Sequence, residues 1–230
     1  MRFLTPYGRG TALTIAGGFL AGAALIGAFA AFVETSRPIV RPAFASVAVL
    51  DVLLACAVLW FFRNPARTPP EGEGLLLAPA DGKVTAIDEA EEPVHLGARA
   101  RRVSIFLSIL DVHVNRAPCA GRVEKVEYTP GRFLNALKER SALENERNLV
   151  GLGGTPFGRV AVVQIAGLIA RRIVCRLDPG EAVEAGQPFG MLKFGSRTDV
   201  YLPLDAPVEL CVAPGDRVRA GVTVIARVRA

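Results

Sequence analysis

Residues that bind metals or form cross-links are scarce in this 230-residue chain. It has two histidines, His95 and His113, and four cysteines, none of them in a CxxC pair. We expect no metal site, because structural zinc sites take four Cys or His ligands at short spacings. The wide spacing of the cysteines favours free thiols in a reducing compartment, although their even number also leaves disulfides open.

Aromatic residues and long basic runs are also few. The chain has one Trp and three Tyr, and no five or six basic residues in succession, so we expect no nucleic-acid partner. The net charge of +5 and the isoelectric point near 9.3 nevertheless suit an anionic partner. We favour an anionic membrane surface. A solvated basic surface without a specific partner is the alternative.

Apolar residues concentrate near the start of the chain. Residues 10–33 carry no charge, which exceeds the ~20 apolar residues that span a bilayer, and a cleaved signal peptide is the alternative. Residues 43–62 are similar but contain Asp51, so this segment either spans the membrane or lies in its interface. The short link between them predicts an antiparallel helical hairpin over 1–62, followed by a linker over 63–74. We expect the cell membrane as location, with the remaining domain, 75–230, on the cytoplasmic side.

The remainder of the chain is dominated by short segments typical of strands. Candidate strands, rich in β-branched residues or alternating in polarity, cover 82–88, 102–108, 159–166, 172–177, 199–203 and 222–228. One helix is predicted over 134–146, where helix-forming residues predominate. We therefore expect a mostly-β fold, a small sandwich or barrel with one short helix. Segments 79–84, 179–186 and 214–221 resemble the turns of biotinyl/lipoyl barrels, but no carrier-lysine hairpin accompanies them.

Five short motifs follow one another along the chain. They are FFRNPAR (61–67), APADG (78–82), FLSILDVHVNRAP (106–118), NERN (145–148) and FGS (194–196). Together they resemble the phosphatidylserine decarboxylases, in particular the short bacterial and archaeal-like branch of this pyruvoyl-dependent family. The resemblance extends from about residue 61 to residue 202.

The resemblance implies that the chain is a proenzyme that cuts itself between Gly195 and Ser196. The Ser196 hydroxyl would attack the Gly195 carbonyl, and β-elimination and hydrolysis would then leave a pyruvoyl group at residue 196. The products, 1–195 and 196–230, would remain together as a heterodimer. The pyruvoyl cofactor would form a Schiff base with phosphatidylserine and release CO2 and phosphatidylethanolamine, without a metal. Glycine at 195 leaves the carbonyl open to attack.

A serine nucleophile needs a base, and His113 is the expected one. Asp81, in a Gly-containing turn, is expected to orient His113 as in a Ser-His-Asp arrangement, with turn capping as its alternative role. Asp111 is the rival for this role, because on a strand it would share a face with His113. Many family members carry a second histidine where this chain has Arg116. Arg116 is expected to bind the substrate phosphate or carboxylate.

Further polar residues are weighed as substrate ligands or as structural groups. Asn145, Arg147 and Asn148 are expected to bind the lipid headgroup, or else to form a polar helix end. His95, in a charged loop, is interpreted as a surface residue. The competing functions are a non-enzymatic, membrane-anchored, lipoyl-like adaptor and a hydrolase that uses Ser196 or His113 directly.

Overall fold

The structure, a computed structural model, describes residues 3–32, 40–137, 140–168, 172–193 and 196–229. The chain divides into two compact units, Met1–Pro65 and Ala66–Ala230. The domain bounds expected from the sequence stay a prediction. Gly195 and Phe194 lie outside the described residues, whereas Ser196 lies within them.

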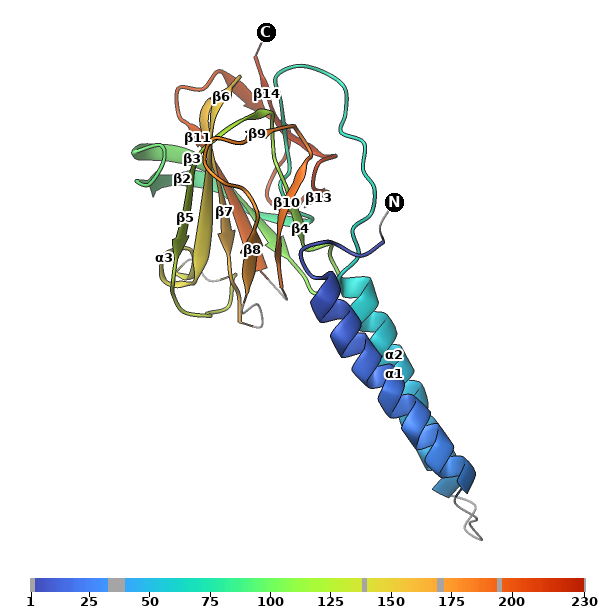
Figure 1. Cartoon of the computed structure of the whole chain (residues 1–230). Helices are drawn as coiled ribbons and strands as arrows, with labels where there is room; N and C mark the ends of the chain where they lie inside the picture. Colours follow the sequence, from blue (N-terminus) through green and yellow to red (C-terminus); the bar gives the residue numbers. More distant parts are fainter. Residues whose placement is uncertain (1–2, 33–39, 138–139, 169–171, 194–195, 230) are drawn as a thin grey trace. The chain divides into compact units, whose positions relative to one another are not determined.

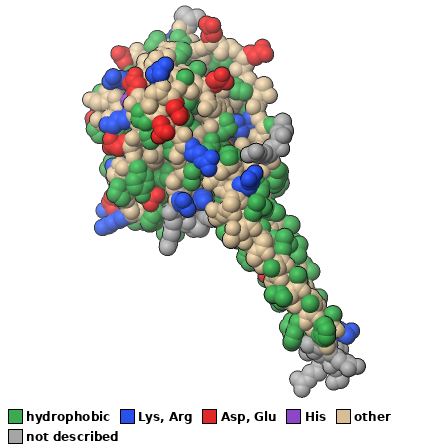
Figure 2. Space-filling model, viewed as in Figure 1, with side chains coloured by type: hydrophobic (Ala, Val, Ile, Leu, Met, Phe, Trp, Pro, Cys, Tyr) green, Lys and Arg blue, Asp and Glu red, His purple; other side chains and the backbone are tan. Residues whose placement is uncertain are grey.

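The first unit is a pair of long apolar helices, α1 (Arg9–Phe32) and α2 (Val40–Phe61), which lie side by side (Figure 1). Both are long and apolar enough to cross a membrane, and Figure 2 shows an uncharged surface along most of their length. The helices are antiparallel: Phe29 and Phe44 stack edge to face at 5.4 Å, while at the other end Thr5 donates to the carbonyl of Phe62.

Asp51 of α2 faces α1. A side-chain carbon placed on Gly22 would come within 3.1 Å of an Asp51 carboxylate oxygen, so the small residue at 22 makes room for the carboxylate between the helices. Placing a carboxylate against a neighbouring helix reduces its exposure to lipid.

The second unit is mostly β, as predicted, with one short helix. Its elements are β1 (Leu75–Leu77), β2 (Gly82–Glu92), β3 (Ala98–Leu107), β4 (Val114–Arg116), β5 (Gly121–Thr129), α3 (Ser141–Glu144), β6 (Arg147–Thr155), β7 (Gly158–Ile165), β8 (Ile173–Cys175), β9 (Ala182–Val183), β10 (Pro188–Leu192), β11 (Ser196–Pro203), β12 (Val208–Leu210), β13 (Arg217–Val218) and β14 (Val224–Val228).

Eight of these strands form one antiparallel sheet, in the order β13-β2-β3-β11-β7-β6-β5-β9, which curls into a half-barrel (Figure 1). Two smaller sheets have the orders β4-β10-β8 and β1-β14-β12. The larger hydrophobic core lies against one face of the large sheet and includes Val103, Val162 and Val200. Burying each such side chain stabilises the fold by about 1.5–3 kcal/mol.

The position of β11 inside the large sheet matters for function. Along its whole length, Ser196–Pro203, it pairs with Ala100–Leu107 of β3, and on its other side Arg197–Tyr201 pairs with β7. Because side chains alternate across a strand, Ser196, Thr198 and Val200 share one face and Arg197 and Asp199 the other. Ser196 therefore starts a strand that is hydrogen-bonded on both sides.

All six predicted strands are confirmed, each shifted by a few residues at its ends. The helix predicted over 134–146 is wrong in extent, because among the described residues of this range α3 covers only Ser141–Glu144. Main-chain hydrogen bonds join Arg132 to Glu144 and Glu146 to Arg132, and they hold this segment in a loop in spite of its helix-forming residues. Tertiary hydrogen bonds here override local propensity.

Candidate active site

Ser196 has a buried hydroxyl. Its side chain is fully buried, and within the described residues its Oγ has no hydrogen-bond partner. Leaving a buried polar group unpaired costs about 1–3 kcal/mol, and such groups are rare in folded proteins. An unpaired hydroxyl keeps its oxygen lone pairs and its proton available for a reaction, as a nucleophile requires.

A second titratable group lies close in sequence to Ser196. Lys193 is only 8% exposed, and burial together with the positive charge of Arg172 lowers the pKa of its ammonium group. A lysine with a lowered pKa gives up its proton more readily than a free one and can act as a base. The sequence gives no sign of this property of Lys193, because its burial and its proximity to Arg172 depend on the tertiary structure.

His113 precedes β4 and is fully buried. Its Nδ1 lies 2.9 Å from the main-chain oxygen of Asp111. Nδ1 therefore carries the proton, and in the neutral ring Nε2 is the basic nitrogen. The main-chain oxygen of His113 accepts a hydrogen bond from the N–H of Leu192 at 3.0 Å. This bond holds His113 against β10 at Leu192, which lies four residues before Ser196 along the chain.

Asp81 lies in the turn before β2 and is 8% exposed. Its carboxylate accepts hydrogen bonds from both Nη atoms of Arg67, one at 2.6 Å, and from the N–H of Ala220 at 2.8 Å. The expectation that Asp81 orients His113 stays a prediction. The structure adds Arg67, which belongs to the first sequence motif, as the cation bound by this carboxylate.

The turn that carries Asp81 packs tightly on its neighbours. The carbonyl of Pro79 accepts hydrogen bonds from the N–H of Arg116 and from Nδ2 of Asn115. Gly82 has a φ of 151°, and a side-chain carbon there would lie 2.0 Å from the carbonyl oxygen of Phe106. Only glycine fits this close approach. The APADG motif is therefore held to β4 through Pro79 and to β3 through Gly82.

A chain of buried amide groups connects four strands around Ser196. Asn115 of β4 donates to Oγ1 of Thr198 in β11 at 3.1 Å and accepts from Nε2 of Gln164 in β7 at 2.9 Å. Gln164 in turn accepts from Nδ2 of Asn148 in β6 at 3.1 Å. Buried networks of this kind fix strand positions when each member is paired. The network holds β4, with His113 at its start, against β11, which begins at Ser196.

Three residues expected to bind substrate are engaged with the main chain. The amide of Asn145 bonds the N–H and C=O of Leu134 and the C=O of Ala166, and this residue ends α3, as the helix-end alternative predicts. Arg116 is 6% exposed and donates to the carbonyl of Gly186 at 3.0 Å, and Arg147 donates to the carbonyl of Leu143 at 2.6 Å. Their roles toward a lipid headgroup stay predictions.

Two interpretations from the sequence are wrong. His95 is not a surface residue: it is 8% exposed, and its Nε2 lies 3.1 Å from the carbonyl oxygen of Leu152, because the carboxylate of Glu92 binds the N–H groups of residues 94–96 and folds this turn onto the sheet. Asp111 is not on a strand but in a turn, where its carboxylate binds the N–H and hydroxyl of Ser108. Its rival role in orienting His113 stays a prediction, and its main-chain oxygen lies 2.9 Å from Nδ1 of that ring.

The other face of β11 carries a buried ion pair. Arg197 donates from Nε and Nη2 to the two carboxylate oxygens of Asp199 at 2.6 and 2.8 Å, and Nη2 also donates to the hydroxyl of Ser104 at 2.8 Å. On the same face, burial and the charge of Asp199 raise the pKa of Tyr201 to about 12. These groups anchor β11 on the face opposite to Ser196.

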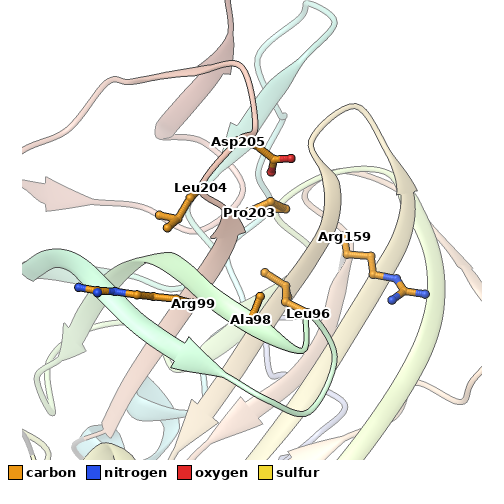
Figure 3. Close-up of a pocket in the computed structure, with 7 residues that line it drawn as sticks. All are labelled: Leu96, Ala98, Arg99, Arg159, Pro203, Leu204 and Asp205. Carbon is orange, nitrogen blue, oxygen red and sulfur yellow. The ribbon is translucent and has the colours of Figure 1, made fainter.

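One cavity lies far from Ser196. A cavity of about 410 Å³ is lined by seven residues, Leu96, Ala98, Arg99, Arg159, Pro203, Leu204 and Asp205 (Figure 3). Because Pro203 ends β11 and Ser196 begins it, this cavity lies at the opposite end of the sheet. In the part of the chain that the structure describes, no three His, Cys, Asp or Glu side chains form a group that could bind a metal ion.

Comparison with known proteins identifies the family. The family model described as "Phosphatidylserine decarboxylase" matches residues 54–226. Two relatives named "Phosphatidylserine decarboxylase proenzyme" have high coverage. The one from Carboxydothermus hydrogenoformans is 50% identical over 79% of this chain and 84% of its own, and that from Chlorobium luteolum is 44% identical over 97% and 99%. This chain therefore belongs to the phosphatidylserine decarboxylase family.

Proposed function

We propose that this protein decarboxylates phosphatidylserine to phosphatidylethanolamine and CO2, after cutting itself between Gly195 and Ser196 and converting Ser196 to a pyruvoyl group. The observation that carries the proposal is the buried, unpaired Ser196 hydroxyl at the start of a central strand, in a chain whose relatives are named proenzymes. No other buried side-chain oxygen or nitrogen in the described residues lacks a partner.

Self-cleavage begins when Ser196 Oγ attacks the carbonyl carbon of Gly195 and loses its proton to a base. The amide becomes an ester, with a free α-amino group on residue 196. Removal of the Ser196 α-proton then expels the Gly195 carboxylate, so that the chain 1–195 ends in a normal carboxyl group. Water replaces the nitrogen of the resulting dehydroalanine, and ammonia leaves. The pyruvoyl group supplies a ketone. Its adduct with the substrate amine accepts the electron pair that stays behind when the C–C bond breaks and CO2 leaves.

His113 is the proposed base for the first proton. Its Nδ1 donates a proton to the Asp111 carbonyl, so in the neutral ring Nε2 is the nitrogen that can accept a proton. Its backbone is fixed by Leu192, so the ring is positioned before any substrate binds. During decarboxylation the same ring is proposed to return a proton to the substrate α-carbon. Lys193, three residues before Ser196 and with a lowered pKa, is proposed as a second proton-transfer group.

The two fragments are proposed to stay associated as a heterodimer. The fragment 196–230 contains β11, β12, β13 and β14. Of these, β11 pairs with β3 and β7, β13 with β2, and β14 with β1, all from the fragment 1–195. Hydrogen-bonded strands on both sides of β11 and a shared core keep the new chain end at residue 196 inside the sheet.

The enzyme is proposed to act at the cytoplasmic side of the cell membrane. The two apolar helices have the length to cross a bilayer. All four cysteines are free thiols, which suits a reducing compartment for the β unit. The substrate is itself a membrane lipid, so attachment of the catalytic unit to the membrane shortens its search for substrate.

Intact-mass spectrometry of the purified protein tests the proposal. We expect two chains, with masses that correspond to 1–195 and to 196–230 with a pyruvoyl end, and conversion of phosphatidylserine to phosphatidylethanolamine. The Ser196→Ala variant should give one uncut, inactive chain. A single wild-type chain of full mass would refute the proposal, and hydrolytic activity of such an uncut chain would favour the hydrolase alternative.

A further inference from the structure

One rim of the large sheet collects the ends of several strands around Ser196. Ser196 pairs with Leu107, the last residue of β3, and Ile165, the last residue of β7, pairs with Arg197 of β11 and Arg147 of β6. Thr129, at the end of β5, also pairs with Arg147. The connections after β3, β5 and β7 therefore leave the sheet at the same rim, and Figure 1 shows α3 at this end of the sheet.

The exposed apolar side chains of the β unit concentrate on these connections. In the connection after β3, Ile109 and Leu110 are 49% and 76% exposed. Between β5 and β6, Leu137 and Leu143 are 58% and 79% exposed, and Leu168, after β7, is 64% exposed. We name these five residues the apolar rim. Exposed apolar groups gathered in this way commonly mark a contact with a membrane or a protein.

The opposite rim differs. There β11 ends at Pro203, and the large apolar residue that follows, Leu204, is 38% exposed, less than any member of the apolar rim. Leu204 also lines the cavity of Figure 3. The large apolar side chains are thus more exposed at the end where Ser196 begins β11 than at the end where Pro203 closes it.

Three arginines lie on two of the connections that carry the apolar rim. Arg132 and Arg140, in the connection after β5, have side chains that are 73% and 77% exposed, and both pair with the single carboxylate of Glu144. Arg172, after β7, is exposed and close enough to Lys193 for its charge to affect that group. In the described residues of the connections after β5 and β7, the three arginines outnumber the two acidic residues, Glu144 and Glu146, which leaves an excess of positive charge beside the exposed leucines.

We propose that the apolar rim, with Arg132, Arg140 and Arg172, is the surface through which the β unit docks onto an anionic membrane. Leucines at the tips of separate connections enter the boundary between headgroups and acyl chains, and the arginines bind lipid phosphates. Charge complementarity favours anionic lipid over a second copy of this chain, whose own rim is equally basic. The rim also borders Ser196, so docking brings the lipid headgroup to the residue proposed to form the cofactor.

This inference rests on the proposed function for its purpose, but its test does not require catalysis. The Ser196→Ala chain, which stays uncut under the proposed function, is combined with Trp60→Phe to remove the single native tryptophan. One tryptophan is then introduced by Leu110→Trp or Leu168→Trp on the apolar rim, or by Leu204→Trp as the control at the other end of β11. Each full-length variant is reconstituted into vesicles that contain brominated phosphatidylglycerol, or brominated phosphatidylcholine alone.

We expect bromine to quench the two rim tryptophans and to leave the tryptophan at 204 close to its fluorescence in unbrominated vesicles. Quenching at the rim should be stronger in anionic vesicles and should fall as salt is added, since salt screens the arginines. Circular dichroism of each variant checks that the strands have formed.

Equal quenching at positions 110 and 204, or none at 110 and 168 in correctly folded protein, would overturn the proposal. A blue shift of the rim tryptophans that depends on protein concentration in lipid-free detergent would also overturn it, because it would assign the rim to a second copy of the chain. Rim quenching in an uncut, inactive chain supports docking even if the proposed reaction fails.

Discussion

The unpaired hydroxyl of Ser196 leads to a stability change of unusual sign. Replacing a buried serine by alanine normally destabilises a protein, because a hydrogen bond is lost. At Ser196 no such bond is present within the described residues, and the methyl group of alanine removes a buried polar atom instead. We therefore expect Ser196→Ala to raise the free energy of unfolding of the precursor by about 1–3 kcal/mol, the usual penalty of an unsatisfied buried group.

The comparison requires chains that are all uncut. A His113→Gln background supplies them, since the proposed base is then absent, and Ser196→Ala is added to it. The matched control is Ser104→Ala in the same background. Ser104 is also fully buried, on the neighbouring strand β3, but its hydroxyl accepts a hydrogen bond from Arg197 at 2.8 Å. In this control the free energy of unfolding should fall by about 1.5–3 kcal/mol, the value of a hydrogen bond to a charged group.

Urea unfolding in detergent, followed by far-UV circular dichroism, measures the three free energies. The expected order of stability is the double variant with Ser196→Ala, then the background, then the double variant with Ser104→Ala. If Ser196→Ala destabilises the chain as much as Ser104→Ala does, the hydroxyl has a partner and the argument for a free nucleophile is refuted. Self-cleavage of the His113→Gln chain would refute the role of His113 as the base.

Three further predictions concern the assembly, the buried ion pair and alkaline pH. A C-terminal affinity tag should retain the fragment 1–195 together with 196–230 in native buffer and release it in guanidinium; loss of 1–195 in native buffer would contradict the strand-pairing argument. Asp199→Asn should lower the free energy of unfolding by about 3–5 kcal/mol, because it leaves the buried guanidinium of Arg197 without its carboxylate. The control Glu209→Gln, at an exposed ion pair, should leave the free energy of unfolding nearly unchanged. Similar effects of the two substitutions in chemical denaturation would refute the difference between the buried and the exposed pair. Burial raises the pKa of the Cys119 thiol from 9.0 to about 12, so its contribution to stability is complete below pH 9 and is lost as the pH rises to 12. Cys119→Ala should flatten the decline of the unfolding free energy over that range, and an unchanged slope would contradict this assignment.

The position of the proposed cleavage site inside the sheet has a consequence for maturation. Ser196 pairs with Leu107 of β3, and the strand that it begins continues to Pro203 between two neighbours. The strand can be held in place before the peptide bond breaks, because its pairing begins at Ser196 itself. Folding of the β unit is thus expected to precede self-cleavage.

The sequence alone determined the apolar helices, the strand-rich domain and the residue at which chemistry is proposed. These features depend on local patterns: apolar length for residues 10–33, β-branched alternation for 102–108, and the order of short motifs that ends at Ser196. Such patterns can be recognised in the sequence because each depends on residues that are close together along the chain.

Only the tertiary structure decided which polar residues are committed to the fold. Asn145, expected to bind a headgroup or end a helix, binds the main chain of two loops, and Asn148 belongs to a buried chain of amides. The burial of His95 and the pairing of Asp81 with Arg67 also depend on partners distant in sequence. The role of a polar residue depends on which donors and acceptors lie within about 3 Å of it. Strand order and register decide which groups these are, and neither the type of the residue nor its sequence neighbours specify that order and register.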